Sequence, residues 1–317
     1  MAKYLVTGGC GFIGSHLAES LLEGGHQVRI LDDFSTGKME NVPPQCDIIT
    51  GDVADSDMVR RCMHDMDGCF HLAAIASVQE SNEEWIRTHQ VNLTGTINVF
   101  NAAKEKRTPV VYASSAAVYG DNADIPLKES SVVSPLVAYG ADKLGSELHA
   151  RVASLVHGVP TTGMRFFNVY GPRQNPASSY SGVISIFVDR VMNHQALTIF
   201  GDGEQTRDFI YVGDVVQFLR ASMKNINSTS SVFNVCTGET VSINQLAKIV
   251  MSITASQVPV TYQATRKGDI RVSVGDPEYA QQALGVVAEY PLARGLKMFI
   301  DYSEVTGVDT MKSQRSV

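Results

Sequence analysis

A glycine-rich turn near the start of the chain constrains the fold more than any other stretch. The turn, Thr7-Gly8-Gly9-Cys10-Gly11-Phe12-Ile13-Gly14, follows an apolar run at 4–6 and precedes a segment whose apolar residues recur at helical spacing. Between a buried strand and a helix, such a turn can hold a pyrophosphate, because its glycines let the backbone approach and the first N–H groups of the helix face the anion. The alternative is a turn without a ligand.

Asp32 favours the ligand-binding interpretation. It ends the next apolar run, Val28-Arg29-Ile30-Leu31, about 20 residues beyond the turn, where a carboxylate accepts hydrogen bonds from the adenosine ribose of a dinucleotide. The same carboxylate would repel a 2′-phosphate. The pattern therefore favours NAD over NADP.

Strand and helix patterns alternate through the first half of the chain. Further apolar runs at 47–50, 69–74 and 109–115 are separated by helical patterns, which predicts an α/β fold with a doubly wound parallel sheet. Ligands bind beyond the carboxyl ends of the strands in such sheets. We therefore expect the residues at these ends to form the site.

Three polar residues in this region each have a structural alternative. Asp52 suits the adenine amino group, or it caps a helix that begins near Ser56. His71 lies inside a strand and is interpreted as structural. Asn92 falls in a helix expected over 83–106 and is either a surface residue or one kept for a specific hydrogen bond.

Length and composition bound the remaining possibilities. With 317 residues and 44% hydrophobic content, the chain can form a cofactor domain with a smaller domain attached. The net charge of −7 disfavours nucleic acid as a partner. The five cysteines lack disulfide or zinc spacing, so we expect reduced thiols and no metal. Without a secretory signal or an apolar run of membrane-spanning length, a soluble, cytoplasmic protein is expected.

Tyr139 and Lys143 stand four residues apart and therefore on one face of a helix. A phenol, with a reference pKa of about 10, is a poor base at neutral pH, and a neighbouring ammonium together with a cationic nicotinamide favours the phenolate. Ser115, at the end of the 109–115 strand, can bind the same substrate oxygen. Tyr and Lys occur at this spacing by chance, but together with the nucleotide turn and Asp32 they predict proton transfer on a substrate.

These motifs resemble those of a known family. The glycine turn, Ser114-Ser115-Ala116-Ala117-Val118-Tyr119-Gly120, Tyr139 with Lys143, and Arg165-Phe166-Phe167-Asn168-Val169-Tyr170-Gly171-Pro172-Arg173 are similar to those of the extended short-chain dehydrogenase/reductases that act on nucleotide sugars. The resemblance covers about residues 3 to 300 and is greatest to the UDP-hexose 4-epimerases. We expect a Rossmann domain at 1–170 and an α/β substrate domain at 171–302, with a segment around 208–238 returning to the first. A polar tail is expected at 303–317.

The resemblance also implies roles for individual residues. The catalytic trio would be Ser115, Tyr139 and Lys143. Cofactor contacts are implied for Gly8, Gly11, Phe12, Ile13, Gly14, Asp32, Asp33, Phe34, Ser35, Thr36, Gly37, Asp52, Val53, Leu72, Ala73, Ala74, Asn92, Tyr139, Lys143 and Phe167. Substrate contacts are implied for Ser77, Ser115, Asn168, Phe200, Arg207, Arg266, Asp269, Arg271 and Ser273. Alternatively, Asn168 is a turn residue, Phe200 a core aromatic, and the arginines surface salt-bridge partners.

Two further positions bear on the reaction and the sugar. In the 4,6-dehydratases and decarboxylases of the family an acidic residue follows the serine, whereas this chain has Ala116 and Ala117, whose methyl groups cannot donate a proton. Ser273 aligns with a sugar-pocket position where a tyrosine would fill the space for an acetamido group. The resemblance thus implies C4 epimerisation of UDP-GlcNAc and UDP-GalNAc, without excluding UDP-glucose and UDP-galactose.

Two rival functions remain open. A 4,6-dehydratase or another sugar epimerase of the same family is the first, and a non-catalytic NAD-binding sensor or scaffold is the second. As a partner, the resemblance implies a second copy of the chain, bound through the helix around 92–106 and the helix that carries Tyr139.

Overall fold

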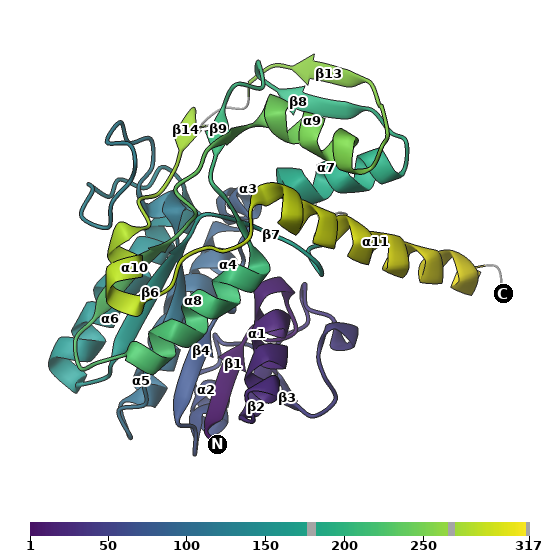
Figure 1. Ribbon diagram of the computed structural model, residues 1–317. Helices are drawn as coiled ribbons and strands as arrows, with labels where there is room; N and C mark the ends of the chain where they lie inside the picture. Colours follow the sequence, from purple (N-terminus) through teal and green to yellow (C-terminus); the bar gives the residue numbers. More distant parts are fainter. Residues whose placement is uncertain (176–181, 266–269, 315–317) are drawn as a thin grey trace.

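A seven-stranded parallel sheet forms the centre of the molecule (Figure 1). The computed structural model describes residues 1–175, 182–265 and 270–314. In spatial order the strands are β11 (Ser231–Val235), β6 (Thr161–Phe166), β5 (Val110–Ser115), β4 (Gly68–His71), β1 (Lys3–Thr7), β2 (Gln27–Asp32) and β3 (Asp47–Thr50). The predicted doubly wound parallel sheet is confirmed, and its strand order reverses between β1 and β4.

Helices cover both faces of this sheet. One face carries α1 (Phe12–Glu23), α8 (Val212–Asn225) and α10 (Glu278–Leu284), which share an apolar core with the strands. The opposite face carries α2 (Ser56–Met63), α5 (Gly95–Ala103) and α6 (Ala138–His157), packed over a second core. Short 3-10 turns lie at η1 (Met39–Asn41) and η3 (Ala116–Val118).

The single helix expected over 83–106 is wrong in detail. The segment instead holds α3 (Val78–Glu83), α4 (Trp85–His89), a π-helical turn η2 (Gln90–Thr94) and then α5. Asn92 lies fully buried in the π-helical turn, where its side chain accepts from the Ile75 N–H at 2.8 Å and donates to the Ile75 carbonyl at 3.0 Å. Of the two interpretations of Asn92, the specific hydrogen bond is correct.

A second lobe begins where β6 ends. It contains three small sheets, formed by β7 (Asn168–Tyr170) with β10 (Phe209–Tyr211), by β8 (Leu197–Phe200) with β13 (Val260–Gln263), and by β9 (Thr206–Arg207) between β12 (Val241–Ser242) and β14 (Val272–Ser273). Its helices α7 (Val183–Met192), α9 (Ile243–Ile253) and α11 (Leu292–Gln314) enclose a separate apolar cluster. The chain returns to the first lobe through α8 (Figure 1) and then β11, the edge strand next to β6.

Helix α11 continues further than expected. It runs to Gln314 and so includes most of the segment predicted to be a polar tail. In the described part of the chain, no helix combines the length and apolarity needed to cross a membrane.

A buried ion pair joins α6 to the central strands. Arg165 on β6 donates from Nε and Nη2 to the two carboxylate oxygens of Glu147 on α6, at 2.9 and 2.7 Å, and both side chains are less than one-tenth exposed. The Ser114 hydroxyl of β5 donates to the same carboxylate at 2.6 Å. The charges are therefore matched and hydrogen-bonded, as buried charges must be.

All five cysteines are free thiols. Cys10, Cys62, Cys69 and Cys236 are buried and Cys46 is half-buried. Burial raises the pKa of the Cys10 thiol to about 12 and that of Cys46 to about 11, and it raises the pKa of the other three thiols as well. The expectation of reduced, structural cysteines fits these environments.

Replacing Glu147 by Gln should destabilise the protein by about 3 to 5 kcal/mol, because it leaves the Arg165 charge buried without its counter-charge. The control is Asp301→Asn, which removes an exposed partner of Lys297 on α11 and should cost less than about 1 kcal/mol. Urea unfolding of both variants measures the difference. Equal stability of the two variants would show that the buried Glu147–Arg165 pair does not stabilise the fold.

Candidate active site

The glycine turn has the geometry of an anion-binding loop. Gly8 adopts a left-handed backbone with φ of 69°, and a Cβ there would lie 2.7 Å from the backbone nitrogen of Ala73. A Cβ at Gly14 would collide with the Gly8 carbonyl oxygen. Helix α1 starts without a side-chain cap and without an acidic residue in its first turn. Its first N–H groups are therefore available to a phosphate, so the residues present fit a dinucleotide.

Asp32 is buried beside this turn. Its carboxylate accepts from the N–H groups of Cys10 at 2.8 Å and Phe34 at 2.9 Å. Burial raises the pKa of the Asp32 carboxyl, and these two hydrogen bonds oppose the increase. Gly37 packs against the same carboxylate, where a Cβ would lie 2.8 Å from Oδ1. The loop of Asp33 to Gly37 thus folds around Asp32, and the remaining lone pairs of its oxygens suit ribose hydroxyls.

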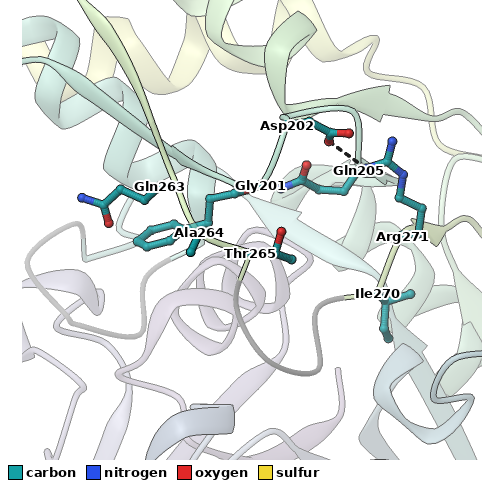
Figure 2. Close-up of a pocket in the computed structure, with 9 residues that line it drawn as sticks. Gly201, Asp202, Gln205, Gln263, Ala264, Thr265, Ile270 and Arg271 are labelled. Atoms are coloured by element: carbon teal, nitrogen blue, oxygen red, sulfur yellow. Dashed lines mark hydrogen bonds and ion pairs between the residues drawn. The ribbon is translucent and has the colours of Figure 1, made fainter.

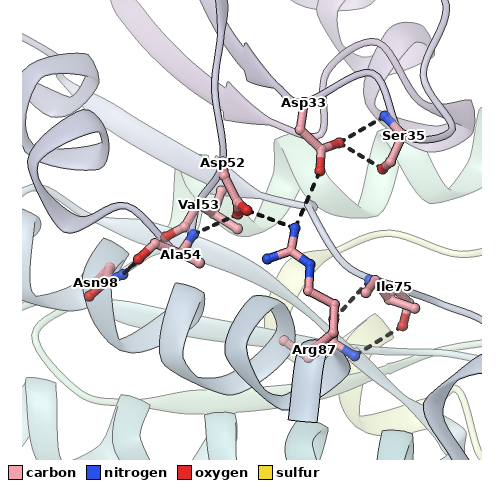
Figure 3. Close-up of polar contacts among 9 residues, drawn as sticks. Asp33, Ser35, Asp52, Val53, Ala54, Ile75, Arg87 and Asn98 are labelled. Carbon is pink, nitrogen blue, oxygen red and sulfur yellow. Dashed lines mark hydrogen bonds and ion pairs between the residues drawn. The ribbon is translucent and has the colours of Figure 1, made fainter. Parts of the chain in front are cut away.

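Asp52 does not cap helix α2. That position belongs to Asp55, whose side chain accepts from the N–H groups of Asp57 and Met58. Asp52 instead accepts from Ala54 N–H at 2.8 Å and from Arg87 at 2.7 Å (Figure 3). The capping alternative is therefore wrong, and the carboxylate stands at the edge of the sheet next to β2.

The β4 strand completes the cofactor edge. It ends at His71, so Leu72, Ala73 and Ala74 lie just beyond its carboxyl end. The ring of His71 bonds to the hydroxyls of Thr7 at 2.7 Å and Thr96 at 3.0 Å, and burial lowers its pKa to about 3. His71 is thus a neutral structural histidine, as expected.

Ser115, Tyr139 and Lys143 come together at the carboxyl end of β5. The Ser115 hydroxyl lies close enough to the Tyr139 phenol to oppose the increase in its pKa, and Lys143 Nζ lies 5.7 Å from the centroid of the tyrosine ring. Ser115 also caps η3, accepting from Ala117 N–H at 3.2 Å. The three residues, predicted to lie together, thus form one cluster at the carboxyl end of β5.

Burial dominates the electrostatics of the cluster in the protein without a cofactor. Burial raises the pKa of the Tyr139 phenol, and the Ser115 hydroxyl only opposes this increase. Burial also lowers the pKa of the Lys143 ammonium to about 8, although Asp142 opposes the decrease. The protein alone therefore keeps the phenol protonated at neutral pH, and the expected lowering of its pKa by Lys143 is not achieved by this cluster alone.

The second lobe contains a cavity of about 290 Å³ (Figure 2). Phe200 and Arg271, both predicted substrate residues, line it together with Asp202 and Thr265. Arg271 donates to Asp202 at 2.7 Å in a pair that is about 60% exposed on both sides. The salt-bridge alternative for Arg271 is thus realised, but at the rim of a cavity and not on a plain surface. Arg266 and Asp269 lie outside the described residues.

Three other predicted substrate residues are held by strand pairing or local hydrogen bonds. Ser273 pairs with Arg207 in the register of β14 and β9. Asn168 donates from Nδ2 to the Asp208 carbonyl at 3.1 Å. Ser77 caps α3 by accepting from Glu80 N–H at 2.9 Å. Each position thus has a local hydrogen-bonding role in addition to any ligand contact.

Phe167 and Val53, predicted at the cofactor, are largely buried in apolar clusters. A Cβ at Gly275 would lie 2.7 Å from the Phe167 ring, so the segment after β14 packs directly on this phenylalanine. Both side chains pack in these clusters, so a cofactor would contact only their exposed edges or their backbone atoms.

Sequence reasoning missed Glu147, Arg165 and Arg87. Glu147 stands four and eight residues beyond Lys143 and Tyr139, so the helical spacing could have identified it as a member of the same stripe. Arg87 carries no local signal, because its partners come from two distant loops.

Stability should depend on pH through Lys143. Below pH 8 the buried ammonium penalises the folded state. Between pH 8 and about 10.5 only the unfolded chain retains the proton, so stability rises with pH. Relative to Lys143→Met, wild type should gain up to about 3 kcal/mol over this range, measured by urea unfolding of nucleotide-free protein. A constant difference between the two proteins would contradict the lowered pKa.

Comparison with known proteins agrees with this site. The model of the family described as "NAD dependent epimerase/dehydratase family" matches residues 4–236. The UDP-glucose 4-epimerase of Thermotoga maritima, solved with UDP-glucose, is 35% identical with a TM-score of 0.92, covering 96% of this chain and 99% of that one. The UDP-N-acetylglucosamine 4-epimerase of Methanobrevibacter ruminantium, solved with UDP-N-acetylmuramic acid, has the same identity, coverage and TM-score.

Relatives with another activity are also similar. A UDP-N-acetyl-alpha-D-glucosaminuronate decarboxylase of Bacillus cytotoxicus is 34% identical over 273 residues, which is 82% of this chain and 83% of the relative. The chain belongs to the NAD-dependent epimerase/dehydratase family of extended short-chain dehydrogenase/reductases.

Proposed function

We propose that this protein is a UDP-sugar 4-epimerase that acts on UDP-GlcNAc and UDP-GalNAc, and also on UDP-glucose and UDP-galactose. The observation that carries the proposal is the cluster of Ser115, Tyr139 and buried Lys143, in which Lys143 Nζ lies 5.7 Å from the centroid of the tyrosine ring and two alanines follow Ser115 in η3. This cluster can move a proton at a sugar oxygen and has no acidic neighbour at 116 or 117 for elimination.

Tyr139 is assigned the proton transfer. As a phenolate it takes the proton of the sugar 4-hydroxyl and later returns it to the same oxygen, while the Ser115 hydroxyl binds that oxygen at both stages. When bound, NAD⁺ supplies a reversible acceptor for the hydride of sugar C4. Between the two half-reactions the 4-keto sugar, tethered by its nucleotide, rotates to present its other face.

Lys143 is assigned an electrostatic and positioning role. Because burial holds the pKa of the phenol above its usual value, additional positive charge is needed to favour the phenolate. The Lys143 ammonium lies beside the ring, and the residues at the cofactor edge would bring the cationic nicotinamide close to it. Binding of the oxidised cofactor is thereby coupled to the basicity of Tyr139.

The rival functions make different predictions. A 4,6-dehydratase of the same family would release a stable keto product, and another sugar epimerase would release a different epimer. The similar decarboxylase adds a decarboxylated product as a further alternative. Ala116 and Ala117 disfavour dehydration and decarboxylation. A non-catalytic NAD-binding sensor or scaffold would bind cofactor without turning over sugar nucleotides, and the intact trio argues against it.

The choice of sugar is assigned to Ser273. This residue pairs in register with Arg207, and the Asp208 N–H donates to its carbonyl oxygen at 2.9 Å, so its backbone position is fixed beside a predicted substrate arginine. A small side chain there leaves room for an acetamido group at sugar C2.

A homodimer is the proposed assembly. Leu148, Val152, Leu155 and Val156 are all about half to three-quarters exposed, and their spacing aligns them on one face of α6. Helix α5 packs beside α6. A second copy placed against these two helices would cover this apolar face of α6. The mass of the protein in solution tests the dimer.

Replacing Tyr139 by Phe should lower kcat for UDP-sugar epimerisation by at least about 100-fold, since the ring stays but the proton carrier is lost. NAD should remain bound, as its absorbance in the purified protein reports. The control is Tyr279→Phe, which removes a half-exposed phenol on α10. An unchanged turnover rate would remove Tyr139 from the mechanism.

Replacing Ser273 by Tyr should lower kcat/KM for UDP-GlcNAc and UDP-GalNAc at least about tenfold while sparing UDP-glucose and UDP-galactose, because the ring fills the acetamido space. Turnover of the four UDP-sugars measures this selectivity. Ser273→Ala, which keeps the position small, is the matched control. A uniform loss on all four sugars would show that Ser273 does not select the sugar.

A further inference from the structure

Arg87 joins two carboxylates that follow neighbouring strands of the sheet (Figure 3). Its Nη2 lies 2.7 Å from Asp52 Oδ2 and 3.9 Å from Asp33 Oδ2. Asp33 follows β2 and Asp52 follows β3. The guanidinium therefore connects two loops at the carboxyl edge of the sheet, next to Asp32.

Each carboxylate is oriented by its own loop. Asp33 Oδ1 accepts from the Ser35 N–H at 3.0 Å and from the Ser35 hydroxyl at 2.7 Å. Asp52 Oδ1 accepts from the Ala54 N–H at 2.8 Å. In both residues the Oδ2 atom is thus left toward Arg87.

The backbone behind the bridge is fixed as well. Asn98 of α5 donates to the carbonyl oxygens of Val53 and Ala54 at 3.0 Å each, which anchors the loop after β3 to a helix. The Arg87 side chain is 42% exposed. It is the least buried member of the bridge, since Asp33 is 35% and Asp52 32% exposed.

We propose that Arg87 is a clasp over the adenine-nucleotide half of the bound dinucleotide. The proposal rests on the proposed cofactor site, in which Asp33, Ser35 and Asp52 contact the adenosine. A guanidinium is planar and can lie against the face of a purine while its edge N–H groups remain on a carboxylate. Closing the two loops across the adenosine then slows its escape.

The exposure of the bridge argues for a ligand-related role. An ion pair between side chains that are 32% to 42% exposed contributes little to folding. The same pair contributes more when a bound base excludes water from it. An epimerase regenerates its cofactor in each turnover, so slow release costs nothing in rate. Arg87 is thus a cofactor-retaining residue, with no part in the chemical step.

The test compares Arg87→Ala with Arg60→Ala, which removes another exposed arginine, paired with Asp57 at 3.0 Å on α2. Calorimetry gives the Kd, and stopped-flow displacement the dissociation rate, of NAD⁺, ADP-ribose and nicotinamide mononucleotide on the full chain. Arg87→Ala should weaken NAD⁺ and ADP-ribose about tenfold and speed their dissociation, while leaving the mononucleotide unaffected. Arg60→Ala should match wild type.

Equal or tighter binding of ADP-ribose by Arg87→Ala would overturn the clasp, as would an equal loss for the mononucleotide. Unchanged thermal unfolding confirms that the variant is folded. These measurements use no sugar nucleotide. A wild-type protein that binds ADP-ribose through Arg87 but does not interconvert UDP-sugars would contradict the proposed function and leave the clasp intact.

Discussion

The buried Glu147–Arg165 pair is the interaction on which the geometry of the active site depends. Tyr139, Lys143 and Glu147 occupy one stripe of α6, and the third of them is fixed to β6 by two short charged hydrogen bonds. The same carboxylate receives the hydroxyl of Ser114, the residue before Ser115. One electrostatic contact therefore sets the distance between the helix that carries the phenol and the strand that carries the serine.

The pair also reaches beyond the catalytic cluster. Arg165 donates to the Tyr119 hydroxyl at 2.8 Å, and Tyr119 donates in turn to the Asn234 side chain at 2.6 Å. Asn234 lies on β11, the strand that returns from the second lobe. Hydrogen bonds to charged groups in a low-dielectric interior are strong, so this chain of contacts gives the junction of the two lobes a rigid base. Helix α6, β6 and β11 are thereby held to one frame.

Much of this arrangement follows from short-range sequence patterns. The ends of β1, β2, β3 and β5 were predictable, because buried parallel strands read as apolar runs and glycine or polar residues end them. The placement of Tyr139 and Lys143 on one helix face was predictable from their spacing, and that of Ser115 from its position at the end of a strand. The sequence left alternatives open where a distant partner decides the outcome. Asn92, in a π-helical turn, pairs with the Ile75 backbone, and Asp52 turns toward Arg87 while Asp55 caps α2. Neither contact produces a periodic pattern of residues from which it could be predicted.

The protonated cysteines have a practical consequence for a protein built around a redox cofactor. A thiolate is the form that reacts with peroxide, alkylating reagents or another disulfide, and burial keeps every thiol of this chain well away from that form at neutral pH. Oxidation of Cys10 would affect the site directly, since this residue lies within the nucleotide turn and its N–H donates to Asp32. Because its sulfur is enclosed and uncharged, air and oxidants should spare the nucleotide turn.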